Sequence, residues 1–107
     1  MAKFIYLATL IAIISLYQVE AAFDGTLNRQ VLIEWLGKSV TDYTINRIDI
    51  RRKNIMRIDP DTFRGLTKLN ELHLEENTIE KLDPNLFTGL DSLTLIHLNS
   101  NSITTIE

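Results

Sequence analysis

The residues best suited to chemistry are two histidines, His73 and His97, which lie 24 positions apart in the sequence. Asp49 precedes His73 by the same interval. Imidazole and carboxylate groups bind zinc, and imidazole changes its charge near neutral pH, so these three residues could form a metal or pH-sensing site. A metal site, however, needs three or four converging ligands. We therefore interpret them as two exposed histidines beside a carboxylate, and we expect no catalytic residue, no bound metal and no cofactor.

The composition argues against most enzymes and against nucleic-acid binding. The chain has 107 residues, enough for one domain, and no cysteine for a disulfide, a thiolate nucleophile or a cysteine-based metal site. Its net charge of −3 lacks the basic excess of a general nucleic-acid binder. The sequence also lacks the motifs of serine hydrolases, zinc proteases and nucleotide-binding loops. We expect a binding or structural module that is not an enzyme.

Residues 1–21 have the pattern of a secretory signal peptide. Lys3 is followed by an uncharged, mostly apolar run of 14 residues, Phe4–Tyr17. A membrane-spanning helix needs about 20 residues, whereas the apolar part of a signal peptide needs about 7–15. Val19 and Ala21 then supply the side chains of a cleavage site. The pattern predicts a secreted, extracellular chain without a membrane span; a buried N-terminal helix and an uncleaved anchor are the alternatives.

A repeat of 24 residues organises residues 45–107. Apolar residues and one asparagine recur at fixed places, and each unit is joined to the next by an Asp-Pro-x-x-Phe-x-Gly-Leu segment, at 59–66 and at 83–90. The two clearest units are Leu66-x-x-Leu69-x-x-Leu72-x-Leu74-x-x-Asn77-x-Ile79 and Leu90-x-x-Leu93-x-x-Ile96-x-Leu98-x-x-Asn101-x-Ile103. Self-similarity at a fixed period is the mark of repeat architectures, in which neighbouring units share one core.

This pattern resembles the extracellular leucine-rich repeat family with 24-residue typical repeats. The resemblance covers residues 45–107, about two and a half repeats with the last one incomplete. It implies a short α/β solenoid, with parallel strands on the concave face and an irregular or 3-10 convex side. It also implies a secreted protein that mediates protein-protein or protein-glycan recognition, in an innate-immune setting; the alternative is the N-terminal fragment of a membrane receptor ectodomain.

Alternation along the repeat separates core residues from exposed ones. Leu72 and Leu74 should face the core and His73 the opposite side, so we expect Leu72→Ala to destabilise the fold and His73→Ala to matter little. Phe63 and Phe87 should stack behind the strands. Asn77 and Asn101 should cap backbone groups where the chain leaves each strand. In the first repeat Lys53 stands in the place of that asparagine, so either the turn is shifted by one residue or it goes without its cap.

Residues 22–44 fit no repeat, and we interpret them as an N-terminal helical cap. Leu27, Val31, Leu32, Trp35 and Leu36 follow helical spacing. Thr26 could begin this helix and Gly37 could end it. We expect Leu32, Trp35 and Leu36 to cover the first repeat; a peripheral membrane helix or a partner-binding helix is the alternative.

The concave face is the candidate binding surface, because solenoids usually bind on their concave sheets. Residues 24 apart should form columns across the strands, and three columns should pair arginine with glutamate: 47 with 71, 51 with 75, and 52 with 76. The candidate binding residues are Arg47, Asp49, Arg51, Arg52, Glu71, His73, Glu75, Glu76, Leu95, His97 and Asn99.

The C-terminal end of the repeats should lack a cover. The apolar residues there should have core on one side only: Leu93, Ile96, Leu98, Ile103 and Ile106. About three repeats are needed for independent stability. We expect a longer protein to continue beyond this end, or a partner or a second copy of the chain to cover it.

Overall fold

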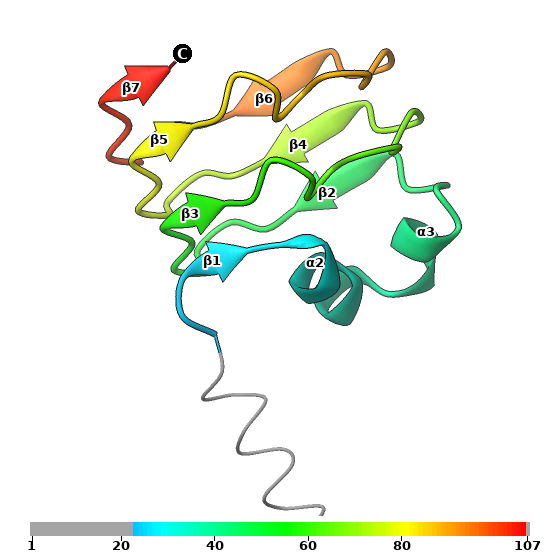
Figure 1. Cartoon of the computed structure of the whole chain (residues 1–107), viewed down its shortest axis with the longest axis horizontal. Helices are drawn as coiled ribbons and strands as arrows, with labels where there is room; N and C mark the ends of the chain where they lie inside the picture. Colours follow the sequence, from blue (N-terminus) through cyan, green and yellow to red (C-terminus); the bar gives the residue numbers. More distant parts are fainter. Residues whose placement is uncertain (1–22, 107) are drawn as a thin grey trace, which may run out of the picture.

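The computed structural model describes residues 23–106, so the predicted signal peptide lies outside the described residues. Within residues 23–106, seven short strands and two helices follow one another (Figure 1). In order they are β1 (Thr26–Leu27), α2 (Arg29–Leu36), α3 (Lys38–Thr41), β2 (Arg47–Asp49), β3 (Arg57–Ile58), β4 (Glu71–His73), β5 (Lys81–Leu82), β6 (Leu95–His97) and β7 (Thr105–Ile106).

Three of the strands form a parallel sheet in the order β2-β4-β6, one strand from each repeat. Arg47 pairs with Glu71, and Glu71 with Leu95, so the register advances by the length of one repeat from strand to strand. Because side chains alternate along a strand, the middle residues Ile48 and Leu72 point into the core, where both are fully buried. The predicted columns of residues 24 apart are therefore confirmed.

The remaining strands form two small parallel pairs, β1-β3 and β5-β7, on the other side of the molecule (Figure 1). Turns at 60–65 and 84–89 lead from this side back to the sheet, in agreement with an irregular convex side. Gly65 and Gly89 close these turns at φ of 79° and 80°, a left-handed conformation that glycine adopts without strain. Within these turns the rings of Phe63 and Phe87 stack with their centroids 6.4 Å apart, as the sequence predicts.

The asparagine that follows the strand of the second repeat, Asn77, connects the second repeat to the first. The Asn77 side-chain oxygen accepts hydrogen bonds from the backbone N–H groups of Lys53 and Ile55, both at 3.0 Å. Its amide group donates to the carbonyl oxygens of Ile50 and Leu74 at 3.1 and 3.0 Å. The first repeat therefore has its cap, supplied by the next repeat and not by its own residue Lys53.

The turn of the first repeat is not shifted either. Arg52, Glu76 and Ser100 occupy equivalent positions and share a left-handed conformation, with φ of 54°, 56° and 59°. Asn101 repeats the capping role one unit later, because its side-chain oxygen accepts from the N–H of Ile79 at 3.1 Å. The first repeat therefore has an unshifted turn and no capping asparagine of its own, and it is capped from the next repeat; the predicted role of the asparagines is confirmed.

The N-terminal helix begins later than the sequence suggests. Asn28, not Thr26, caps α2: its side-chain oxygen accepts from the N–H of Val31 at 2.9 Å. Thr26 and Leu27 instead form strand β1, because they pair with Arg57 and Ile58 of the first repeat. Gly37 ends the helix as predicted, at a φ of 78°.

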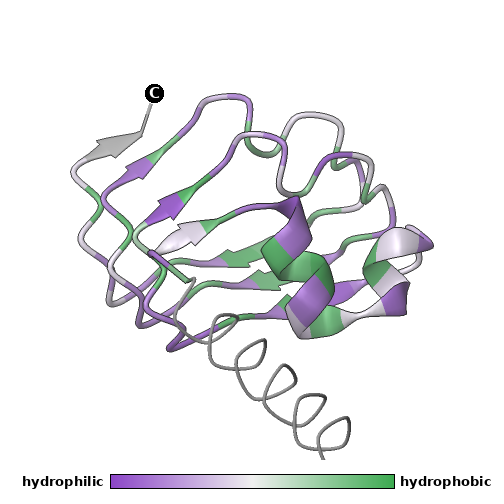
Figure 2. Cartoon of the chain, turned by 60° about the horizontal axis from the view of Figure 1, so that its bottom comes forward, coloured by the Kyte–Doolittle hydropathy of each residue, from purple (hydrophilic) through white to green (hydrophobic). Residues whose placement is uncertain are grey.

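Helix α2 lies beside β1 and β2 at one end of the repeats (Figure 1) and carries both hydrophobic and hydrophilic residues (Figure 2). Leu32 is fully buried in the core. Trp35 and Leu36 are partly buried and pack against it. The Trp35 ring also meets Phe23 edge to face, with centroids 5.1 Å apart. Leu32, Trp35 and Leu36 therefore all pack against the core, as predicted, but only Leu32 is fully buried.

The opposite end of the sheet is more open. Ile96 of β6 is 36% exposed, whereas its counterparts Ile48 and Leu72 are fully buried. Leu93, Leu98 and Ile103 are only partly buried, as predicted; the side chain of Ile106 lies outside the description. Within residues 23–106, no helix has the length and apolarity that crossing a membrane requires.

Candidate functional site: the exposed face of the parallel sheet

The face of the β2-β4-β6 sheet opposite the core holds the candidate binding residues. Alternation along each strand brings the first and third residues to this face, and the parallel register aligns them across strands. One column contains Arg47, Glu71 and Leu95, and the next contains Asp49, His73 and His97, as the sequence predicts. The contacts within and between these columns differ from the expected ones.

On the first strand, Asp49 is engaged by arginines of its own repeat. The Arg51 guanidinium donates to both oxygens of the Asp49 carboxylate, at 2.9 and 3.0 Å, and Arg47 lies 3.6 Å from the same carboxylate. The hydrogen bond from the Arg51 side chain lowers the pKa of Asp49, and that of Arg51 is raised in turn. Asp49 is therefore an ion-pair partner on the first strand.

Two of the three predicted arginine–glutamate pairs form. The Arg52 guanidinium donates to both carboxylate oxygens of Glu76, at 2.5 and 3.2 Å, which lowers the pKa of Glu76. Arg47 lies 3.7 Å from Glu71. The predicted pair between Arg51 and Glu75 is wrong, because Arg51 bonds to Asp49 and Glu75 lies against His73.

His73 is buried, and this corrects the expectation that it is exposed. Only 8% of its surface is accessible to solvent. Its Nε2 lies 2.5 Å from Oε1 of Glu71, and its Nδ1 is hydrogen-bonded to Oε2 of Glu75 at 3.4 Å. Glu75 is itself 9% exposed, and its Oε1 has no hydrogen-bond partner among the described residues. Each ring nitrogen of His73 therefore faces a carboxylate group.

His97 packs on His73 from the neighbouring strand. The two imidazole rings are stacked, with centroids 4.5 Å apart and planes 10° from parallel. The group that joins the two histidines is Glu71, not Asp49: one potential ligand atom from each of Glu71, His73 and His97 lies within 4.8 Å of the others. Asp49 lies in the same column as the histidines, as predicted, but the carboxylate grouped with them is that of Glu71.

The third strand contributes a less polar surface. Leu95 is 44% exposed on the candidate binding face. Asn99 is exposed as well, and its backbone carbonyl accepts from the N–H of Glu76 at 3.1 Å. The face therefore passes from arginines on β2, through a buried histidine between carboxylates on β4, to an exposed leucine beside His97 on β6.

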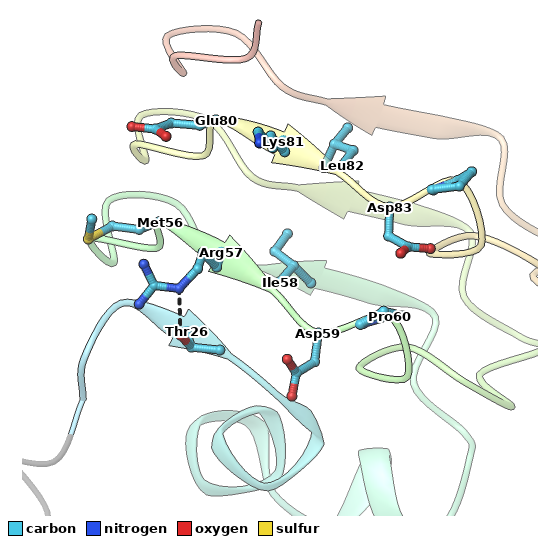
Figure 3. Close-up of a pocket in the computed structure, with 11 residues that line it drawn as sticks. Thr26, Met56, Arg57, Ile58, Asp59, Pro60, Glu80, Lys81, Leu82 and Asp83 are labelled. Atoms are coloured by element: carbon cyan, nitrogen blue, oxygen red, sulfur yellow. Dashed lines mark hydrogen bonds between the residues drawn. The ribbon is translucent and has the colours of Figure 1, made fainter. Parts of the chain in front are cut away.

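A hollow of about 740 Å³ lies away from this face, between β3 and β5 (Figure 3). Four of its five charged residues recur at the repeat interval, Arg57 with Lys81 and Asp59 with Asp83; the fifth is Glu80. Arg57, Lys81 and Asp59 are exposed, and Asp83 is half-buried. The hollow is an open gap between consecutive repeats with no buried polar group aimed into it from its lining, so the histidine face is the better candidate site.

The sequence reasoning missed the cluster of Glu71, His73 and Glu75. Its signal was present, since alternation along Glu-Leu-His-Leu-Glu at 71–75 puts the three polar residues on one face. Pairing across strands alone does not reveal these contacts, which join residues two apart in the same repeat. The Asp49 and Arg51 pair follows the same rule.

Comparison with known proteins agrees with this architecture. Residues 44–103 match a family model described as leucine rich repeat. No curated protein and no solved structure has a significant match to the chain. The matched segment covers 60 of the 107 residues and spans the whole β2-β4-β6 sheet. The chain belongs to the leucine-rich repeat family.

Proposed function

We propose that this chain is a secreted, non-enzymatic recognition protein that binds a protein ligand on the exposed face of the β2-β4-β6 sheet. The observation that carries the proposal is the make-up of that face. Exposed Arg47 and Arg51 stand at one side of it, and the exposed Leu95 stands at the other. Arginine is enriched at protein interfaces, and Leu95 adds an exposed apolar contact. A glycan is the alternative ligand, and an extracellular, innate-immune setting follows from the family resemblance.

The N-terminal segment and the sheet together support a short solenoid in which residues 23–44 act as the cap of the first repeat. Leu27 and Leu32 are fully buried in the common core. Arg29 donates from its guanidinium to the carbonyl oxygens of Thr62 and Arg64, at 3.0 and 2.9 Å, and so ties α2 to the convex turn. Such a cap keeps one end of the stack out of water without the help of a disulfide.

We further propose that the open end at β6 is covered by a second copy of the chain. Residues 92–106 contain no aspartate, glutamate, lysine or arginine. Edge strands that stay single usually carry charges that prevent pairing. Continuation of the repeats in a longer receptor ectodomain is the competing explanation for the same exposed Ile96.

A binding screen tests the main proposal. The purified chain would be presented to an extracellular protein library and to a glycan array. Arg47→Glu and Leu95→Ala should weaken capture of a bound protein at least tenfold, because interface anchors commonly contribute more than about 1.4 kcal/mol. Lys68→Glu is the matched control, since Lys68 is exposed but lies outside the strands. Ligand binding that survives both face variants would contradict the proposal.

A further inference from the structure

We propose that Glu71, His73 and His97 form a binding site for one Zn²⁺ ion. Two imidazoles and a carboxylate are a donor set that zinc accepts, with a fourth place left for water or another ligand. Zinc ligands at about 2.0–2.2 Å from the ion lie ~3.4 Å from one another. The three potential ligand atoms are already within 4.8 Å of one another. Nε2 of His73 and Oε1 of Glu71 are 2.5 Å apart, so rotation of Glu71 has to widen this contact while rotation of His97 brings its nitrogen closer; both residues are half-buried.

The sheet holds these residues in a fixed arrangement. Glu71 and His73 stand two apart on β4 and so share one face, and His97 is the parallel partner of His73 on β6. The stacked rings, 4.5 Å between centroids, keep both imidazoles side by side. Ligands mounted on strands are positioned more accurately than ligands on loops.

The charges around His73 call for a cation. A neutral imidazole has one N–H group and one lone pair, yet both ring nitrogens of His73 face carboxylates, Glu71 at 2.5 Å and Glu75 at 3.4 Å. One of the two contacts therefore needs an additional proton or a metal ion between nitrogen and oxygen. A proton would let His73 donate to both Glu71 and Glu75, whereas a zinc ion on Nε2 also uses the lone pair of His97.

Glu75 has the properties of a supporting residue for such a site. Histidines that bind metals usually donate their other N–H to a carboxylate, which fixes the tautomer. Nδ1 of His73 faces Glu75, so donation there leaves the Nε2 lone pair turned toward Glu71. The Oε1 atom of Glu75 is buried without a hydrogen-bond partner among the described residues. A buried carboxylate of this kind is unfavourable unless positive charge lies nearby.

The nearby arginines supply this positive charge only in part. Arg51 interacts with Glu75 through space but is hydrogen-bonded to Asp49. The Arg47 guanidinium lies 3.7 Å from Glu71, but it is half exposed and shared with Asp49, at 3.6 Å. Zinc bound between Glu71 and His73 leaves Arg47 free to keep its contact with Asp49. The site lies on the face proposed for recognition, but its existence does not depend on what that face binds.

Isothermal titration calorimetry with ZnCl₂ on the purified chain tests the proposal. We expect saturable binding of one ion per chain. Glu71→Gln and His97→Ala should each weaken zinc binding at least tenfold, and Glu75→Gln should weaken it about 10–100-fold, as loss of a supporting residue does. Glu80→Gln is the matched control: it removes an exposed carboxylate in the hollow between β3 and β5, away from this face, and should leave the affinity unchanged.

None of these variants replaces the buried His73, so loss of a zinc ligand can be distinguished from loss of the fold. Circular dichroism of each variant would verify that it is folded. Absence of saturable zinc binding by the folded wild-type chain would overturn the proposal and leave a proton as the group between His73 and Glu71. Equal zinc affinity in wild type, Glu71→Gln and His97→Ala would overturn it as well.

Discussion

Asn77 accepts a hydrogen bond from the backbone N–H of Ile55, 22 residues earlier in the sequence, at a distance of 3.0 Å. The bond is buried and joins two consecutive repeats. Asn77 thus satisfies polar groups that would otherwise be buried without partners, on both sides of the boundary between the repeats.

Asn77→Ala should therefore destabilise the chain strongly. It leaves the N–H groups of Lys53 and Ile55 without their acceptor. A buried group without a partner costs about 1–3 kcal/mol. Asn101→Ala is the matched control, because Asn101 is only partly buried and accepts from one N–H. Urea denaturation should show a clearly larger loss for Asn77→Ala; equal losses would show that the boundary between the first two repeats does not depend on this cap.

Leu72→Ala should lower the free energy of unfolding by about 2–5 kcal/mol, because Leu72 is fully buried. His73→Ala should also destabilise, by about 1–3 kcal/mol, since it leaves the buried Glu75 without its nitrogen partner. This differs from the expectation based on alternation alone. His97→Ala, in the half-buried neighbour, should cost much less than either. Thermal unfolding followed by circular dichroism measures all three.

The repeat period was sufficient to predict the sheet, its register and the stack of Phe63 on Phe87, because each depends on residues that recur at fixed spacing. The repeat period does not predict contacts at positions where one repeat differs from the next, or where the repeats meet the N-terminal segment. Asn77 also accepts from the N–H of Lys53, which stands where the later repeats carry an asparagine. Strand β1 forms because Thr26 and Leu27 pair with β3 of the first repeat. Helical spacing in the sequence does not reveal this pairing.

The binding face was predicted in its positions but not in its contacts. Arg51 could pair with Asp49, two residues earlier, or with Glu75 of the next repeat. The sequence permits both. The two pairings differ in burial. Glu75 is buried beside His73, whereas Arg51 is exposed and pairs with Asp49. The depth of a side chain depends on the packing of neighbouring strands, which spacing alone does not determine.

Asp49→Asn should make the chain slightly less stable at neutral pH. The Arg51 hydrogen bond lowers the pKa of Asp49 below its ordinary value of 3.8 in the folded chain. The carboxylate therefore stabilises the fold above pH 3.8, and this contribution is lost as the pH falls through the lowered value. Because the pair is largely exposed, the effect should be less than about 1 kcal/mol. Urea midpoints of wild type and variant should converge on acidification; a gap that widens would contradict the assignment.

Secretion with cleavage after Ala21 is a further prediction. Expression of the chain with its natural N-terminus in a secreting cell, followed by N-terminal sequencing of the medium, should give a protein that begins at Ala22. Replacement of Ala21 by a bulky residue, Ala21→Phe, should block cleavage because the site needs a small side chain. A membrane-bound product that retains Met1 would contradict the prediction.

Self-association through β6 is the last prediction. Within residues 23–106, β6 is hydrogen-bonded to β4 on one edge and to no strand on the other. Four apolar residues around it are incompletely buried: Leu93, Ile96, Leu98 and Ile103. Full burial of one leucine or isoleucine contributes about 1.5–3 kcal/mol. Recovery of even a third of that at four positions on each chain, about 4–8 kcal/mol in all, favours pairing of two open ends.

Sedimentation equilibrium of the purified chain should therefore show dimers or larger species at micromolar concentration. Ile96→Lys should yield monomers, because it places a charge at the uncovered edge. Leu95→Lys is the matched control: Leu95 is adjacent and similarly exposed but faces the binding surface, so association should persist. A chain extended by one further repeat and a polar cap should also be monomeric and melt at a higher temperature. A wild-type chain that is a cooperative monomer, as stable as the capped form, would contradict this account of the open end.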